Sequence, residues 1–188
     1  MQVTTDQQYD IAINSCREIF LKKTKDYGTS WRVYRPISIA DQIYIKAKRI
    51  RNIRETGVQK IDDDATGEFK GIVNYAIIGL IQLDLHNDDP DNDQDEEIPL
   101  EEVTRLYDAK VSLTKKLMQN KNHDYGEAWR DMSQESFVDL ILAKVLRIKQ
   151  IIQNDGKTLV SEGIDANYCD IINYALFALI TRENVNDL

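Results

Sequence analysis

The feature that most constrains this chain is a duplication that covers almost its whole length. The segment KDYGTSWR at residues 25–32 returns as HDYGEAWR at residues 123–130, an offset of 98 positions. Further along, Asn74 and Asn173 stand in the same local sequence, NYA, 99 positions apart. A single repeat of this size indicates a tandem copy of a domain-sized unit rather than a solenoid of short repeats.

We name residues 1–86 repeat one and residues 100–188 repeat two, with residues 87–99 as the linker. The linker carries seven of the acidic residues, whereas the net charge of the chain is −8, so the rest of the chain is close to neutral. The run DDPDNDQDEE offers no apolar side chain to bury, and we expect it to be solvated. An acidic balance disfavours contact with phosphate backbones, but here it belongs to the linker. We do not expect direct nucleic-acid binding.

Each repeat is expected to form three helices, because apolar side chains recur at intervals of three and four residues. The expected ranges are 7–25, 37–55 and 67–84 in repeat one, and 101–121, 136–154 and 165–182 in repeat two. Thr66, Ser136 and Asp165 are expected N-caps. The third helix of each repeat is so apolar that it needs cover from the other repeat. The sequence therefore predicts an all-α fold, a tandem three-helix unit packed as a pseudo-twofold bundle with one shared core.

The sequence also bears on the compartment. No apolar run reaches the length of about 18 residues that a membrane-spanning helix needs, and the N-terminus does not resemble a signal peptide. The two cysteines, Cys16 and Cys169, occupy non-equivalent positions in the repeats, which argues against a disulfide framework. We therefore expect a reduced, cytoplasmic setting without a membrane partner.

The DYG motif allows two interpretations. Gly126, like Gly28, can end a helix in the left-handed conformation, and Asp124 can accept hydrogen bonds in the turn. The aromatic side chains would then only cover the end of the bundle. In the alternative, they line a pocket in which a nucleobase stacks. Those side chains are Tyr27 and Trp31 in repeat one, and Tyr125 and Trp129 in repeat two.

A second set of polar residues lies on the second and third helices of repeat two. If these helices are antiparallel, Arg147 lies level with Asp170, and Lys144 lies level with Asn173. Asp139 would then lie roughly 12 Å from Asp170 along the helix axis, at about 1.5 Å per residue. These residues either form structural links or bind phosphate through Lys144 and Arg147, with Asp170 as a metal or water ligand.

The repeats differ at this second set. The position of Asp170 is Gly71 in repeat one, while Lys46 and Arg49 keep the two basic positions. We therefore expect Arg49 to lack the acidic neighbour that Arg147 has. On this basis repeat one is the better anion binder and repeat two the better cation binder.

The patterns K-x-x-DYG-x-x-W, D-x-x-x-x-K-x-x-R-I and D-x-x-NYA resemble the nucleotide modification associated domain 1 family. The resemblance covers each repeat almost end to end, and it is fuller in repeat two. More distantly, the layout is similar to the MazG-like all-α nucleoside triphosphate pyrophosphohydrolases. Those enzymes hold Mg²⁺ through carboxylates on two helices and cut the α–β phosphate bond of a nucleotide. The resemblance places Asp170 and Asn173 at their second motif, whereas the first motif is replaced by Lys144 and Arg147. It implies Mg²⁺ as a cofactor, Asp170 and Asp139 as catalytic residues, and Asp170, Asp165 and Glu162 as metal ligands.

Three functions therefore compete: a Mg²⁺-dependent nucleotide pyrophosphohydrolase, a non-catalytic nucleotide-binding protein, and a helical interaction module. Converging carboxylates would favour the first, a pocket of basic and aromatic side chains the second, and a closed bundle the third. The expected partner is a nucleotide or nucleoside phosphate, and further homo-oligomerisation is left open. The candidate substrate-binding residues are Lys46, Arg49, Tyr27 and Trp31 in repeat one, and Lys144, Arg147, Asp124, Tyr125, Trp129 and Asn173 in repeat two.

Overall fold

A computed structural model describes residues 3–58, 64–88 and 96–186. Over these ranges the chain forms six α-helices, two short 3-10 helices and no strand. In chain order they are α1 (Thr5–Tyr27), η1 (Ser30–Val33), α2 (Pro36–Thr56), α3 (Ala65–Asp88), α4 (Leu100–Tyr125), η2 (Ala128–Asp131), α5 (Gln134–Gln153) and α6 (Ile164–Asn186). The all-α prediction and the tandem duplication are confirmed. None of the described helices combines the length and the apolar character needed to cross a bilayer.

The helix starts differ from the predicted caps. Ser133 rather than Ser136 caps α5, and its hydroxyl accepts the Ser136 backbone N–H at 3.1 Å. At the start of α3, the Asp64 carboxylate rather than Thr66 accepts a backbone N–H, at 2.8 Å. Asp165 lies within the first turn of α6. The three predicted caps are wrong because the spacing of apolar residues does not show where a helix begins. The first turn of a helix carries few core residues.

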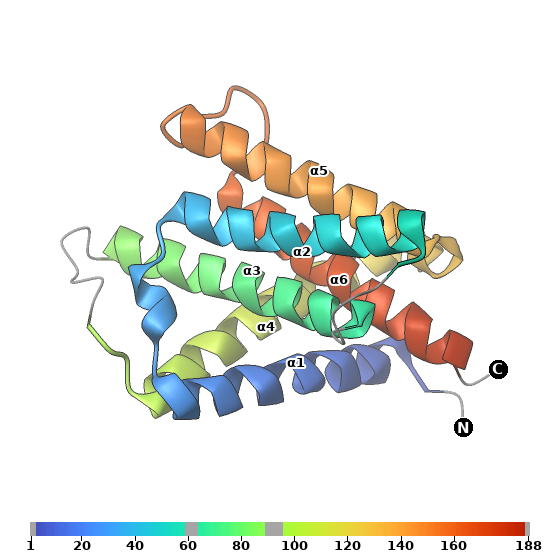
Figure 1. Ribbon diagram of the computed structural model, residues 1–188, viewed down its shortest axis with the longest axis horizontal. Helices are drawn as coiled ribbons and strands as arrows, with labels where there is room; N and C mark the ends of the chain where they lie inside the picture. The colour runs from blue at the N-terminus through green and yellow to red at the C-terminus, as the bar shows by residue number, and fades with distance from the viewer. Residues whose placement is uncertain (1–2, 59–63, 89–95, 187–188) are drawn as a thin grey trace.

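Each helix of repeat one packs against the equivalent helix of repeat two, as Figure 1 shows. α3 contacts α6 at the centre, α2 contacts α5 on one side, and α1 contacts α4 on the other. Every one of these pairs joins a helix of repeat one to the helix at the same place in repeat two. A pseudo-twofold relation between the repeats follows directly from this pairing.

The buried side chains of both repeats form one continuous core. At its centre the ring of Tyr168 on α6 lies against Gly79 on α3. A Cβ atom added to Gly79 would stand 2.6 Å from the ring, so only glycine permits this approach. The central helices are therefore apolar on nearly all sides, as expected for helices surrounded by protein.

Two buried hydrogen bonds cross between the repeats at equivalent places. Tyr9 on α1 donates to the side-chain oxygen of Asn173 on α6 at 3.0 Å. Tyr107 on α4 donates to the side-chain oxygen of Asn74 on α3 at 2.8 Å. The amide nitrogen of each asparagine donates to a backbone carbonyl in the first helix of its own repeat. Asn173, a predicted substrate-binding residue, thus has both polar atoms of its side chain bonded within the core.

The described end of the linker lies against repeat one. The backbone N–H of Ile98 donates to the hydroxyl of Thr29 at 3.0 Å, and Arg32 Nε donates to the carbonyl of Glu96 at 3.4 Å. Residues 89–95, which include most of the acidic run, lie outside the described residues. The linker therefore meets repeat one next to its DYG motif.

Candidate functional site

A cavity of about 350 Å³ opens in repeat one, between the end of α1, η1, the middle of α2 and the start of α3. This volume lies in the range of about 300–1,000 Å³ that is typical of small-molecule sites. Its lining is rich in basic and aromatic side chains and, within the described ranges, has one carboxylate. The charged members are Lys23, Lys46, Lys70 and Glu68, and the large aromatic members are Phe20, Tyr27, Trp31, Tyr34 and Tyr75.

Glu68 is a buried carboxylate at the base of the cavity wall. One of its oxygens accepts from Lys46 Nζ at 3.2 Å, and the other accepts from Arg49. The expectation that Arg49 lacks an acidic neighbour is therefore wrong. Glu68 lies three residues before Gly71, and a shift of three residues keeps a side chain on the same helix face. Comparison of aligned positions alone misses such a displaced partner.

Lys46 passes directly over Gly71. A Cβ atom added to Gly71 would lie 2.9 Å from Cε and 3.0 Å from Cδ of Lys46. The absent side chain at position 71 thus gives the lysine its path into the cavity. The ammonium group also lies 6.0 Å from the centroid of the Tyr75 ring, within the range of a cation–π contact.

Lys23 and Lys70 add two further cations to the lining. Neither forms an ion pair with any residue in the ranges that the structure describes. Because the one lining carboxylate is bound to Lys46 and Arg49, the electrostatic balance of the cavity is positive. Such a cavity favours an anionic ligand.

Trp31 supplies a polar group without a partner. Its side chain is 6% exposed, and its indole N–H is buried with no hydrogen bond among the described residues. The counterpart in repeat two, Trp129, donates to Asn122 at 3.1 Å. In repeat one that position is Thr24, whose hydroxyl donates to a backbone carbonyl instead. A buried N–H without an acceptor costs about 1–3 kcal/mol.

Two tyrosines lie together on the cavity wall. The rings of Tyr34 and Tyr75 are 6.2 Å apart between centroids. Burial, followed by the neighbouring Tyr34, raises the pKa of Tyr75 to about 12. The hydroxyl group of Tyr75 is therefore neutral at physiological pH and able to donate a hydrogen bond.

In repeat two a carboxylate stands between the equivalent lysines. Asp170 is 6% exposed, and its two oxygens accept from Lys121 Nζ and Lys144 Nζ, each at 2.6 Å. Burial opposes the charge on Lys121, but the hydrogen bond and the charge of Asp170 outweigh it and raise the pKa of Lys121. The predicted pairing of Asp170 with Arg147 is not what the structure shows, because Arg147 is exposed and forms no ion pair with a described residue.

The DYG motif of repeat two forms a turn. Gly126 adopts the left-handed conformation, with φ 61° and ψ 35°, which confirms its predicted role. Trp129 is covered by Phe177, stacked at 4.2 Å between centroids, and by Arg130 at 4.4 Å. Tyr125 is 75% exposed, and Asp124 is also exposed, with His123 as its partner. The structure thus gives Trp129 a packing role and leaves Asp124 and Tyr125 on the surface.

Asp139 forms a link between repeats. It pairs with Arg51 across the contact of α2 with α5, and Asp41 pairs with Lys149 at 2.6 Å on the equivalent side. Each residue of one pair matches a residue of the other at an offset of 98. The symmetry of this arrangement fits a structural ion pair, and nothing in it joins Asp139 to Asp170.

The predicted metal ligands do not gather. Glu162 and Asp165 are exposed, whereas Asp170 is buried with both oxygens bound to lysines. Within the part of the chain that the structure describes, no three acidic, histidine or cysteine side chains could hold one metal ion. The donor set around Asp170 therefore does not favour Mg²⁺, and the Mg²⁺ cofactor and the catalytic roles of Asp170 and Asp139 stay predictions.

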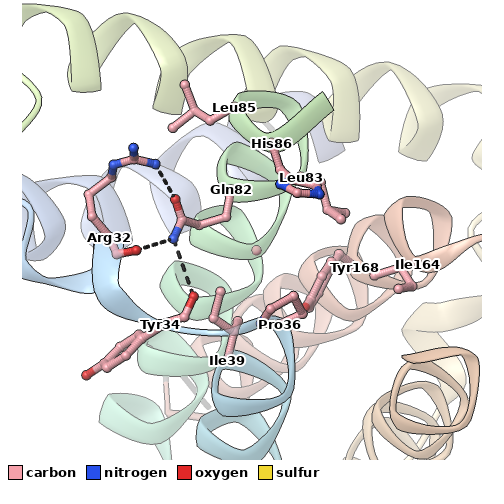
Figure 2. Close-up of a pocket in the computed structure, with 11 residues that line it drawn as sticks. Arg32, Tyr34, Pro36, Ile39, Gln82, Leu83, Leu85, His86, Ile164 and Tyr168 are labelled. Carbon is pink, nitrogen blue, oxygen red and sulfur yellow. Dashed lines mark hydrogen bonds between the residues drawn. The ribbon is translucent and has the colours of Figure 1, made fainter. Parts of the chain in front are cut away.

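A second cavity, of about 310 Å³, lies between α3, the start of α2 and the start of α6 (Figure 2). It is largely apolar, with Ile39, Leu83 and Tyr168 among its lining residues. Its buried cation, Arg32, donates to the side-chain oxygen of Gln82 at 2.7 Å, and the Gln82 amide donates to backbone carbonyls (Figure 2). The sequence alone did not predict this cavity, and its lining has fewer charged side chains than that of the cavity in repeat one.

The fold and the repeated site define a duplicated helical protein with an open basic cavity in repeat one. Comparison with known families gives two matches to one family, nucleotide modification associated domain 1, at residues 23–83 and 121–181. The chain belongs to this family, carried as a tandem pair. No curated protein and no solved structure matches the chain. The similarity to the MazG-like pyrophosphohydrolases therefore stays a prediction.

Proposed function

We propose that the cavity in repeat one binds a nucleoside phosphate, and that the protein is a nucleotide-binding protein rather than a hydrolase. One observation carries the proposal. The cavity combines Lys23, Lys46 and Lys70 with the rings of Tyr75 and Trp31 in a single volume. A phosphate needs cations, and a nucleobase needs aromatic faces and hydrogen-bond partners.

The parts of such a ligand match the parts of the lining. The lysines give the phosphate point charges, each with three donors. The aromatic rings, among them those of Tyr75 and Trp31, offer faces to the base.

The placement of the acidic side chains favours binding of a nucleotide without its cleavage. Metal-dependent phosphate cleavage uses carboxylates that converge on the metal ions. Among the described residues that line this cavity, Glu68 is the one carboxylate, and both its oxygens are bound, to Lys46 and Arg49. A nucleotide here would therefore be held and not cut.

The test is a titration of the protein with nucleoside mono-, di- and triphosphates, followed by calorimetry and by melting temperature, with and without Mg²⁺. A ligand at 100 times its Kd stabilises the folded state by about 2.7 kcal/mol. We expect at least one nucleotide to bind, and we expect Lys23→Ala to weaken it about tenfold. Lys121→Ala is the matched control in repeat two and should leave affinity unchanged.

Two outcomes would oppose the proposal. If no nucleotide shifts the melting temperature, or if both lysine variants act alike, the repeat-one cavity is not a nucleotide site. Chromatography of the incubated nucleotide provides the second arm. Release of a monophosphate and pyrophosphate, dependent on Mg²⁺, would instead favour the pyrophosphohydrolase.

A further inference from the structure

We infer that the phosphate of the ligand lies between Lys23 and Lys46, at the place that the Asp170 carboxylate occupies between Lys121 and Lys144. Repeat two then carries a built-in anion, and each chain binds one anionic ligand through this pair of sites. The inference rests on the proposed function for the nature of the ligand. The position of the anion is argued from the two repeats alone.

The lysines of the two sites occupy equivalent positions in the two repeats. Lys23 and Lys121 are 98 positions apart and stand three residues before Asp26 and Asp124 of the DYG motifs. Lys46 and Lys144 have the same offset. The two pairs of lysines therefore enter the two sites from equivalent helices, the end of α1 or α4 and the middle of α2 or α5.

Repeat two shows what such a pair of lysines binds. Each Asp170 oxygen accepts from one ammonium group at 2.6 Å, Nζ of Lys121 or Nζ of Lys144. These short distances are typical of charge-assisted bonds. The carboxylate is almost fully buried, so the site holds one negative charge away from water. The geometry selected by the two lysines is thus that of a small oxyanion.

Repeat one has the lysines without the anion. Position 71 is glycine, and Lys23 has no ion pair with a described residue. The Glu68 carboxylate pairs with Lys46 from about one helical turn before position 71. Lys23, Lys46 and Gly71 all line the open cavity. An oxyanion that enters this cavity can therefore take bonds from both lysines. Lys46 keeps donors for it because an ammonium group has three.

The experiment tests the position of the anion through substitutions in the protein. Gly71→Asp supplies repeat one with the carboxylate of repeat two, and Gly71→Asn is the matched control with the same shape and no charge. The three atoms nearest to a Cβ atom at position 71 all belong to the flexible side chain of Lys46. The probe is inorganic pyrophosphate, titrated by calorimetry against the full chain.

We expect wild type to bind pyrophosphate at one site per chain. Gly71→Asp should weaken it at least about tenfold, or about 1.4 kcal/mol, while Gly71→Asn stays within about threefold. Equal losses in both variants would show a steric effect and overturn the inference, as would no loss in Gly71→Asp. Two wild-type sites of equal affinity would also overturn it.

The reciprocal variant, Asp170→Gly, removes the built-in anion. We expect a second pyrophosphate per chain and a melting temperature that rises with added pyrophosphate. A folded Asp170→Gly protein that still binds one pyrophosphate contradicts the inference. If this variant does not fold, as judged by circular dichroism, the two Gly71 variants decide alone.

The same titrations separate this inference from the proposed function. Pyrophosphate binding that is sensitive to Gly71→Asp, with no gain in affinity from any nucleoside, leaves the anion position standing and removes the nucleotide. Nucleotide binding that is insensitive to Gly71→Asp does the reverse.

Discussion

The hydroxyl of Tyr9 on α1 lies 3.0 Å from the side-chain oxygen of Asn173 on α6, and this bond joins the first helix of one repeat to the last helix of the other. Tyr107 and Asn74 form the equivalent bond in the opposite direction, at 2.8 Å. All four residues are buried. Each central helix therefore depends on the other repeat for a polar partner as well as for apolar cover.

Removal of either hydroxyl should destabilise the fold. Tyr9→Phe and Tyr107→Phe each leave a buried amide oxygen without its donor, and we expect a loss of about 1–3 kcal/mol in the free energy of unfolding. Urea denaturation measures this, with Tyr125→Phe as the control because Tyr125 is exposed. A loss below about 0.5 kcal/mol in both core variants would contradict a role for the crossed bonds in stability.

Asp139 should behave as a structural residue. Asp139→Asn and Asp41→Asn remove equivalent ion pairs that are largely exposed, and each should cost less than about 1 kcal/mol. Neither should change the affinity for nucleotide or pyrophosphate. Calorimetry on the two variants side by side checks this. A loss of ligand affinity in Asp139→Asn alone would restore the predicted functional role.

The two thiols should be unreactive in the folded protein. Burial raises the pKa of Cys16 to about 12 and that of Cys169 to about 11, and both side chains are enclosed in the core. Because the thiolate is the nucleophile, little of it exists near pH 8. A disulfide reagent such as Ellman's should react slowly with native protein and count two thiols after denaturation. Rapid reaction of one thiol without denaturant would contradict this burial.

The turn after α4 should contribute to acid sensitivity. The bond from Arg130, and then that from Thr5, lowers the pKa of Glu127 below its ordinary value of 4.5. A carboxyl with a depressed pKa stabilises the fold above its unfolded pKa, and this stabilisation is lost as pH falls through the folded pKa. Glu127→Gln should therefore flatten the fall in stability below about pH 4.5, as measured by urea denaturation at several pH values. Glu101→Gln, at an exposed position, is the control, and an equal change in both variants would contradict the assignment.

The order and type of the helices could be predicted because the apolar period and the repeat offset are strong signals. Gly126 could be placed in the left-handed conformation because a glycine directly after a helical segment commonly ends the helix in this way. The lysine of K-x-x-DYG, at Lys23 and Lys121, was part of the pattern, but its role needs the packing of the first helix against the third. Sequence spacing within one element does not supply that packing.

Two further misses have the same origin. Glu68 is the acidic partner of the basic residues in repeat one, but the aligned position in repeat two is Asn167. Alignment of the two repeats therefore does not indicate its role. The ion pair between Asp139 and Arg51 joins one repeat to the other. The sequence spacing considered above relates only helices within one repeat. A signal was present, since the acidic position 41 or 139 and the basic position 51 or 149 are kept in both repeats.

The covalent connection between the repeats has a consequence for what the two sites can become. In an assembly of two identical subunits, every substitution appears twice, so glycine in one copy and aspartate in the other would be forbidden. This chain carries Gly71 and Asp170 at matching places within one molecule. Fusion of the repeats has thus allowed repeat one to keep an open cavity at Gly71. In repeat two the carboxylate of Asp170 fills the equivalent place and contributes only to the structure.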